Sequence, residues 1–503
     1  MVLPLAHPAC GAVRGIRAGQ VNAWLGIPYA RPPVGPLRLR APEPADTWHD
    51  VRDARQFGQA ALQRHVSAVS KPFLGPSVGE DCLSLNVWSP AADGAKRPVA
   101  VWIHGGAFIL GSARIYDGAQ LAEMGDIVVV TMNYRMGALG FVNFRDLTGD
   151  TRFASNPGLR DVVLALQWVR ANIEAFGGDP AQVTLAGSSA GSIMASLLMA
   201  SDDAASLFDR VILQSGTYDL AHSREKSLEV AQAYLDVLGI QNGPDTLEKL
   251  QAVDAAAMLN AQEAVQRRLP GVLATVPWFD GELVPASIEA ARGKTLRAMP
   301  MLGGVNRDET RLFEVIPGLD VIPLARKALE SLLHLHVGEA HAAKVLALYA
   351  DTAVGNRQFA TDLEFLMPML QLAERNSENN PTWLYRFDVT HPMLGGAVHG
   401  LELCYQWNWT GALAMMARGG PLTGNKAALA ERFRGYWISF VRTGNPGAAW
   451  PGFDATRRQT MVFGLPDRVK EDPDGERRTM WPRLQGEVTG GVYRRAVSLL
   501  PTG

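Results

Sequence analysis

Residues Val183–Gly191 have the sequence VTLAGSSAG, and this stretch decides the fold. The apolar run at its start predicts a buried strand, and the Ala-, Leu- and Met-rich segment Ser192–Ala200 predicts a helix directly after it. The pattern Gly-x-Ser-x-Gly between a strand and a helix is typical of a sharp turn that presents a nucleophilic serine. We therefore predict that Ser189 is a nucleophile on a strained bend.

Small residues around this bend have a physical purpose. Gly187 and Gly191 remove side chains that would collide with neighbouring elements at so sharp a turn. The following helix aims its first amides, including that of Ala190, at the space where negative charge develops in acyl transfer. Gly105 and Gly106, in the stretch HGGAF after another apolar run, leave further amides unobstructed. We expect an oxyanion hole made by the amides of Gly105, Gly106 and Ala190.

The composition excludes several classes of function. The chain has 503 residues, 47% of them hydrophobic, and a formal net charge of −2 without long runs of one sign, which disfavours nucleic acids and anionic membranes as partners. No apolar run approaches the length of a membrane span, and Met1–Cys10 lacks the pattern of a signal peptide. Three cysteines, Cys10, Cys82 and Cys404, are too few and too widely spaced for a disulfide framework. We expect a cytoplasmic protein; its oligomeric state is left open.

Strands and helices alternate along the chain. Such alternation predicts an α/β fold with a mostly parallel sheet that helices cover on both faces. No repeat or linker interrupts it, so we expect one domain over residues 1–503, with helical insertions over the active site at about 220–298 and 315–380. Buried strands are predicted at Val99–Ile103, Ile127–Met132, Val211–Leu213, Met299–Leu302 and Trp383–Phe387, and helices at Asn156–Phe176, Ser227–Gln266 and Ile322–Asn376.

A serine hydroxyl needs a base within hydrogen-bond reach and an acid that orients this base. In α/β-hydrolases the chain order is nucleophile, acid, histidine, which reduces the ten histidines to His391 and His399. His399 is flanked by small residues that let its ring approach another loop, whereas His391 precedes a proline in an ordinary turn. Asp308 and Glu309 follow an apolar strand at the end where such sheets build their sites. Spacing alone does not separate these two carboxylates.

Together these stretches resemble the type-B carboxylesterase and cholinesterase family over nearly the whole chain. The resemblance implies an α/β-hydrolase fold and a serine esterase whose triad is Ser189, Glu309 and His399. The matching stretches, in the family's order, are Leu25–Gly35, Glu80–Val87, His104–Phe108, Phe176–Pro180, Gly187–Gly191, Leu213–Gly216, Gly304–Phe313 and Val398–Gly400. The resemblance also implies that Ser215 lies near Glu309 and that Arg38 forms a buried salt bridge with Glu80.

This chain departs from the family at three places. Ser188 stands before the nucleophile where the family often has glutamate, which removes a negative charge beside the site. Cys82 lacks the partner that secreted members have near position 61, which favours an intracellular enzyme. No tryptophan lies between Ala61 and Glu80, where cholinesterases hold a quaternary ammonium by cation–π attraction. Choline esters are therefore not expected as substrates.

The expected function is hydrolysis of small-molecule carboxylic esters through an acyl-enzyme, which requires no metal and no organic cofactor. Aromatic and apolar residues near the site-forming segments predict an apolar substrate pocket, although each fits core packing equally well. They are Phe108, Leu273, Trp278, Phe313, Trp407 and Trp409. Two alternatives use the same sequence features. An amidase or carbamate hydrolase would employ the same triad, and a non-catalytic interaction protein would share the fold while lacking an activated serine.

Overall fold

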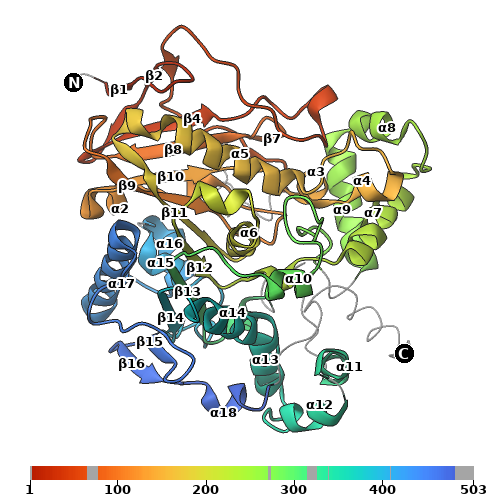
Figure 1. Ribbon diagram of the computed structural model, residues 1–503, viewed down its shortest axis with the longest axis vertical. Helices are drawn as coiled ribbons and strands as arrows, with labels where there is room; N and C mark the ends of the chain where they lie inside the picture. The colour runs from red at the N-terminus through yellow and green to blue at the C-terminus, as the bar shows by residue number, and fades with distance from the viewer. Residues whose placement is uncertain are drawn as a thin grey trace.

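The computed structural model describes residues 3–64, 77–269, 273–313, 326–337, 339–407 and 409–481. Within them, an eleven-stranded sheet forms the centre of the molecule, in the order β16-β15-β14-β13-β12-β11-β9-β10-β8-β4-β3 (Figure 1). The strands from β15 to β10 pair in parallel, and antiparallel strands complete both ends. The sheet strands are β3 (Ile16–Ala18), β4 (Val21–Pro28), β8 (Ser84–Ser89), β9 (Arg97–Ile103), β10 (Val128–Met132), β11 (Gly178–Ser188), β12 (Arg210–Gln214), β13 (Met301–Asn306), β14 (Thr382–Phe387), β15 (Gln459–Phe463) and β16 (Arg468–Glu471). The mostly parallel sheet that the sequence predicts is confirmed.

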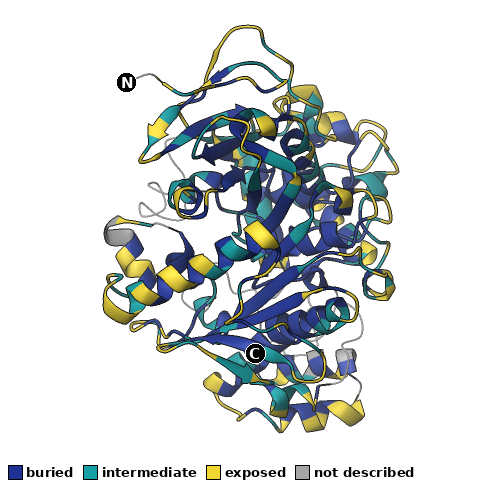
Figure 2. Ribbon diagram, turned by 60° about the vertical axis from the view of Figure 1, so that its left-hand side comes forward, coloured by how far each residue is buried: buried dark blue, intermediate teal, exposed yellow. Residues whose placement is uncertain are grey.

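Both faces of this sheet are buried, as β9 shows. Val99 and Val101 of β9 belong to one hydrophobic cluster, and Ala100 and Trp102 belong to another. Because successive side chains of a strand point to opposite faces, the two clusters lie on opposite sides of the sheet. The first contains apolar residues of α5 (Pro157–Asn172) and α6 (Ala190–Met199), and the second those of α2 (Ala119–Gly125) and α17 (Gly424–Thr443). The central strands are accordingly dark blue in Figure 2, while exposed residues lie mainly on outer helices, loops and edge strands.

Helices occupy most of the two long stretches, Ser227–Gln266 and Ile322–Asn376, that the sequence predicts to be helical. Residues 322–325 and 338 of the second stretch lie outside the described residues, as do 270–272 of the first expected insertion and 315–325 and 338 of the second. The helices of the first stretch are α7 (Arg224–Leu238), α8 (Thr246–Ala252), α9 (Ala255–Arg268) and, further along, α10 (Ile288–Gly293). Those of the second are α11 (Arg326–Val337), α12 (Glu339–Leu346), α13 (Ala353–Thr361), a π-helix at Asp362–Leu366 and α14 (Met367–Ser377). The remaining helices are α3 (Gly137–Phe141), α4 (Phe144–Thr148), α15 (Leu403–Gln406), α16 (Gly411–Arg418) and α18 (Gly475–Arg478).

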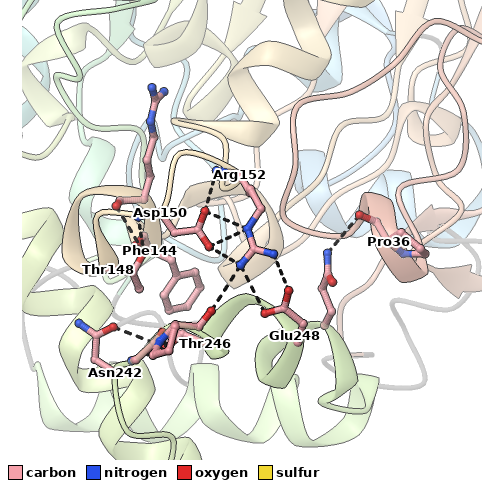
Figure 3. A network of polar contacts seen from close by, with 12 residues as sticks. Pro36, Phe144, Thr148, Asp150, Arg152, Asn242, Thr246 and Glu248 are labelled. Carbon is pink, nitrogen blue, oxygen red and sulfur yellow. Dashed lines mark hydrogen bonds and ion pairs between the residues drawn. The ribbon is translucent and has the colours of Figure 1, made fainter.

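Polar contacts attach α8 to the body of the molecule. Arg152 forms ion pairs with Asp150 in its own loop and with Glu248 of α8 (Figure 3). On the N-terminal side, Arg38 Nε lies 2.9 Å from Glu80 Oε2, and Arg38 Nη1 donates to the carbonyl of Leu250 at 3.1 Å. The Arg38 side chain is 4% exposed and that of Glu80 18%. The ion pair that the resemblance implies is therefore present, with its carboxylate partly hydrated.

The three cysteines are all free: Cys82 and Cys404 are buried and Cys10 is half-buried. This agrees with the absence of a disulfide framework in the sequence pattern. Among the described helices, none combines the length and apolar character that crossing a bilayer requires.

Candidate active site

The turn at Ser189 has the strained geometry that the sequence predicts. Ser189 connects β11 directly to α6 and has φ 55° and ψ −123°, a conformation that residues with a side chain rarely adopt. The two flanking glycines are required by close contacts. A Cβ on Gly187 would lie 2.4 Å from the carbonyl carbon of Gly191, and one on Gly191 would lie 2.1 Å from the carbonyl oxygen of Ile103. The bend therefore holds the serine at the carboxyl end of a central strand.

The loop after β9 passes directly beside this serine. A Cβ on Gly105 would lie 2.8 Å from the Ser188 carbonyl oxygen and 3.0 Å from Ser189 Cβ. Gly106 has φ 124°, so the loop turns sharply there. The expected oxyanion donors, the amides of Gly105, Gly106 and Ala190, belong to segments that border the nucleophile. Tyr116 forms a hydrogen bond with the backbone of Gly105.

Glu309 and His399 form a close pair. His399 Nδ1 lies 2.6 Å from Glu309 Oε2, and the other carboxylate oxygen accepts the amide of Asn306 at 2.7 Å. Glu309 is fully buried. Burial lowers the pKa of His399, but the negative charge and hydrogen bond of Glu309 outweigh this, so its pKa lies above the ordinary value. The carboxylate therefore fixes the ring through Nδ1 and leaves Nε2 for proton transfer.

The Ser189 hydroxyl makes no hydrogen bond to the His399 ring in the described structure. Catalytic hydrogen bonds are often long before substrate binds. The two residues nevertheless share their surroundings: Phe313 and Phe365 line a cavity together with Ser189, and their rings lie 5.1 and 5.3 Å from the His399 ring. His399 therefore lies beside two rings that line the cavity of Ser189.

The alternative acid and base are occupied elsewhere. Asp308 Oδ2 accepts the amide of Ala397 at 2.8 Å, which ties down the loop that carries His399. His391 Nδ1 accepts the amide of Leu394 at 3.1 Å, and its Nε2 lies 2.9 Å from the carbonyl oxygen of Met416. Nδ1 thus stabilises a local turn, and Nε2 connects that turn to α16. The structure brings together Glu309 and His399, and gives Asp308 and His391 structural contacts.

A second buried carboxylate, Glu402, lies behind this pair and was not singled out from the sequence. Asn306 Nδ2 donates to its Oε2 at 2.5 Å and Gln214 Nε2 to its Oε1 at 3.3 Å. Burial raises the pKa of Glu402 to about 7, and the negative charge of Glu309 adds to the effect. The only feature of the sequence that could have pointed to Glu402 is its position three residues after His399. Within the described residues, no cluster of three or more His, Cys, Asp or Glu side chains is arranged to hold a metal ion.

The cavity at Ser189 contains part of the pocket expected from the sequence. Phe108, Leu273 and Phe313 line it as expected. Glu364 and Phe365, which the sequence analysis missed, come from the π-helix. The full lining in the described residues is Ala107, Phe108, Ser189, Ala190, Ile193, Ser215, Leu220, Leu273, Phe313, Glu364 and Phe365.

The three tryptophans expected in the pocket do not line this cavity, and that expectation is wrong. Trp407 is fully buried and packs edge-on against Trp102 with ring centroids 5.0 Å apart. Trp409 Nε1 donates to the Ile115 carbonyl at 2.8 Å. Trp278 is 1% exposed and bonded through its amide to an asparagine side chain. These indoles fill space around the sheet because packing, and not proximity along the chain, sets their direction.

The two other serines near the nucleophile have limited contacts. Ser215 is fully buried, has φ 56° and lines the same cavity, but its hydroxyl makes no hydrogen bond to Glu309 or to any other described residue. Ser188 ends β11, is 1% exposed, and its hydroxyl also has no partner in the described structure. The resemblance implies that Ser215 lies near Glu309, but no hydrogen bond joins these two residues in the described structure.

Comparisons with known proteins agree with this geometry. The carboxylesterase family model matches residues 4–481. The para-nitrobenzyl esterase of Bacillus subtilis is 36% identical over 489 residues, which cover 95% of this chain and 98% of that protein. A solved PNB esterase aligns with a TM-score of 0.87 and 33% identity over 96% of this chain and 100% of that one. A carboxylesterase of Geobacillus stearothermophilus gives a TM-score of 0.82 and 35% identity over 95% and 100%. The chain therefore belongs to the carboxylesterase family and is a carboxylic ester hydrolase with the α/β-hydrolase fold.

Proposed function

We propose that this enzyme hydrolyses small-molecule carboxylic esters with Ser189 as nucleophile, His399 as general base and Glu309 as the acid that orients the base. The pairing of His399 Nδ1 with Glu309 Oε2 at 2.6 Å, at the cavity lined by the strained Ser189, carries the proposal. A serine hydroxyl is a weak nucleophile at neutral pH, so it depends on a base held in one tautomer.

The reaction proceeds in two halves. Ser189 Oγ attacks the ester carbonyl while His399 Nε2 accepts its proton, and the amides of Gly105, Gly106 and Ala190 stabilise the oxyanion. His399 then returns the proton to the leaving alcohol, which frees the acyl-enzyme. Water attacks this intermediate with the same base and releases the carboxylic acid.

Electrostatics at the pair support the role of His399. Glu309 raises the pKa of His399 because its negative charge stabilises the imidazolium, against the opposing effect of burial. The ring is therefore a better proton acceptor at the moment when Ser189 attacks. The full burial of Glu309 keeps water from weakening this interaction.

Replacement of the nucleophile tests the proposal. Ser189→Ala is expected to reduce kcat by up to about a millionfold and to abolish labelling by a fluorophosphonate, which reacts only with an activated serine. Ser196→Ala is the matched control, because its hydroxyl bonds only to the Ile193 carbonyl within the same helix. Retention of most esterase activity by Ser189→Ala would refute the assignment.

Matched ester and amide substrates separate the main reaction from its closest alternative. We expect faster turnover of the ester, because an amine leaving group demands more complete protonation by His399. An amide turned over faster than its ester would identify an amidase. Failure of the fluorophosphonate to label the chain would instead favour a non-catalytic interaction protein.

We also propose a cytoplasmic location without nucleic-acid or membrane partners. The three free thiols suit a reducing compartment, and the net charge of −2 offers no general attraction for polyanions.

A further inference from the structure

Asn306, the last residue of β13, contacts the segments that carry both members of the acid–base pair. It is fully buried, and its backbone pairs in register with Phe387 of β14. Its amide N–H donates to Glu309 Oε1 at 2.7 Å, and its Nδ2 donates to the carbonyl oxygen of Val398 at 3.0 Å. Val398 directly precedes His399. One residue of the central sheet is therefore bonded to the acid and to the loop of the base.

The side-chain amide of Asn306 is held in one orientation. The carbonyl oxygen of Val398 can only accept a hydrogen bond, so Nδ2 and not Oδ1 faces it. Nδ2 also donates to Glu402 Oε2 at 2.5 Å, and Gln214 Nε2 donates to the other oxygen of that carboxylate at 3.3 Å. Rotation of the Asn306 side chain would break two hydrogen bonds in the buried interior, where no water replaces them.

The hydrogen bond between Glu309 and His399 depends on two segments that are far apart in the chain. Glu309 follows β13 by three residues, whereas His399 lies 90 positions later on a separate loop. Displacement of a catalytic group by about 1 Å can reduce the rate about a hundredfold. We propose that Asn306 is a positioning residue whose side chain holds the His399 loop against β13, so that the acid and the base keep their hydrogen bond. This inference rests on the proposed function, because it concerns the geometry of the same triad.

Asn306→Ala removes both side-chain donors and leaves the backbone amide that binds Glu309. We expect kcat, normalised to the fraction of Ser189 that a fluorophosphonate labels at completion, to fall by about ten- to a hundredfold. KM should stay within about threefold, since Asn306 does not line the cavity in the described part of the chain. Asn306→Leu, which resembles asparagine in size and shape, should show the same loss because it also lacks a donor.

The pH profile separates positioning from a general loss of structure. Burial lowers the pKa of His399, and the negative charges of Glu309 and Glu402 raise it. Loosening of the pair weakens the contribution of Glu309. Asn306 opposes the burial that raises the pKa of Glu402, so its loss favours the uncharged form of that carboxyl group. Both changes lower the pKa of His399, and the acidic limb of kcat/KM should move to lower pH in Asn306→Ala.

Asn376→Ala provides the matched control. Asn376 is 1% exposed and its Nδ2 donates to Thr382 Oγ1 at 2.9 Å, but it lies on α14 and does not line the described part of the cavity. Urea unfolding is expected to show a loss of stability in both alanine variants. Only Asn306→Ala is expected to change kcat and the acidic limb.

Three results would overturn the inference. The first is a kcat of Asn306→Ala that stays within about threefold of the wild type. The second is a fall in kcat with an acidic limb that stays in place or moves to higher pH. The third is the same fall and the same shift in Asn376→Ala. Each of them refutes only the role of Asn306 if the wild type hydrolyses esters and is labelled at Ser189. If the wild type does neither, the proposed function itself fails.

Discussion

Four residues around the nucleophile have a strained backbone. Ala107, Phe108, Ser189 and Ser215 have φ values of 51°, 60°, 55° and 56°, and all four line the same cavity. Such conformations cost on the order of 1–3 kcal/mol each for residues with a side chain, and they persist only where the surroundings enforce them. Packing around the carboxyl ends of β9 and β11 supplies this enforcement. The strain thus coincides with the residues that surround the reacting carbonyl in the proposed mechanism.

Gly105 is expected to tolerate no side chain. A Cβ there would lie 2.8 Å from the Ser188 carbonyl oxygen and 3.0 Å from Ser189 Cβ, so Gly105→Ala displaces either the oxyanion loop or the nucleophile. Because loss of one oxyanion donor costs about 10²–10³-fold in kcat, we expect a reduction of at least this order. Gly94→Ala is the control, since a Cβ at Gly94 meets no atom within 4 Å. Equal activity of the two variants would contradict the placement of the loop.

Glu402 is expected to influence the pH dependence of activity. His399 accepts a proton only when neutral, so activity rises as the pH passes through its pKa. The negative charge of Glu402 raises the pKa of His399, after the larger effects of burial and Glu309. Glu402→Gln should therefore lower the pKa of His399 and move the acidic limb of kcat/KM to lower pH. Glu225→Gln, at an exposed position, is the control and should leave the acidic limb unchanged. An acidic limb that moves to higher pH in Glu402→Gln would refute this coupling.

At the scale of elements, a buried ion pair connects the segment after β10 to α5. Arg135 Nη2 lies 2.7 Å from Asp161 Oδ1, and the two side chains are 3% and 0% exposed. Arg135→Met leaves the carboxylate of Asp161 buried without its cation, which is expected to lower the free energy of unfolding by about 3–5 kcal/mol.

Arg38→Met should have a smaller effect, about 1–2 kcal/mol, because Glu80 retains 18% exposure and stays partly hydrated. Urea unfolding of the two variants against the wild type measures both differences. If Arg38→Met lowered the free energy of unfolding more than Arg135→Met does, burial of the remaining carboxylate would not control the loss of stability.

Elements with local determinants could be predicted from the sequence, and elements without them could not. The bend at Ser189 depends on glycines within two residues of it, so its motif was sufficient. Glu364 was missed because the residues of the π-helix are ordinary for an α-helix and nothing local marks the wider turn. Trp407 was misplaced because its direction depends on contacts with distant Trp102. Asp308 and Glu309 were left unresolved by spacing, since only the position of His399 distinguishes them.

At the scale of the molecule, the parallel sheet places the site residues at the carboxyl ends of its central strands. Gly105, Ser189 and Glu309 follow β9, β11 and β13, whose carboxyl ends lie at the same edge because these strands run in parallel within one sheet. This convergence follows from alternation of strands and helices and could be anticipated. The last two strands at one side of the sheet, β15 and β16, were not predicted, because the pairing of β15 with β14 joins segments far apart in sequence.

A buried polar cluster connects the π-helix to the C-terminal part of the described chain. Asp362 is fully buried; Tyr349 donates to its Oδ2 at 2.6 Å, and Arg477 Nε lies 2.7 Å from the same oxygen. Trp481 Nε1 donates to the Tyr349 hydroxyl at 2.8 Å. Two segments more than a hundred positions apart, 349–362 and 477–481, thus meet around one carboxylate, whose protonation state affects the stability of the whole molecule.

Burial raises the pKa of Asp362 to about 6, although the charge of Arg477 opposes the rise. Between about pH 4 and 6 the folded chain therefore retains a proton that the unfolded chain has released, and the associated stability is lost as the pH rises through 6. Asp362→Asn abolishes this titration. Its unfolding free energy should equal that of the wild type near pH 4 and exceed it near pH 7 by up to about 3 kcal/mol. Urea unfolding across this range measures the difference, with exposed Asp351→Asn as the control. A difference that shrinks with rising pH would mean that Arg477 stabilises the ionised carboxylate more than burial destabilises it.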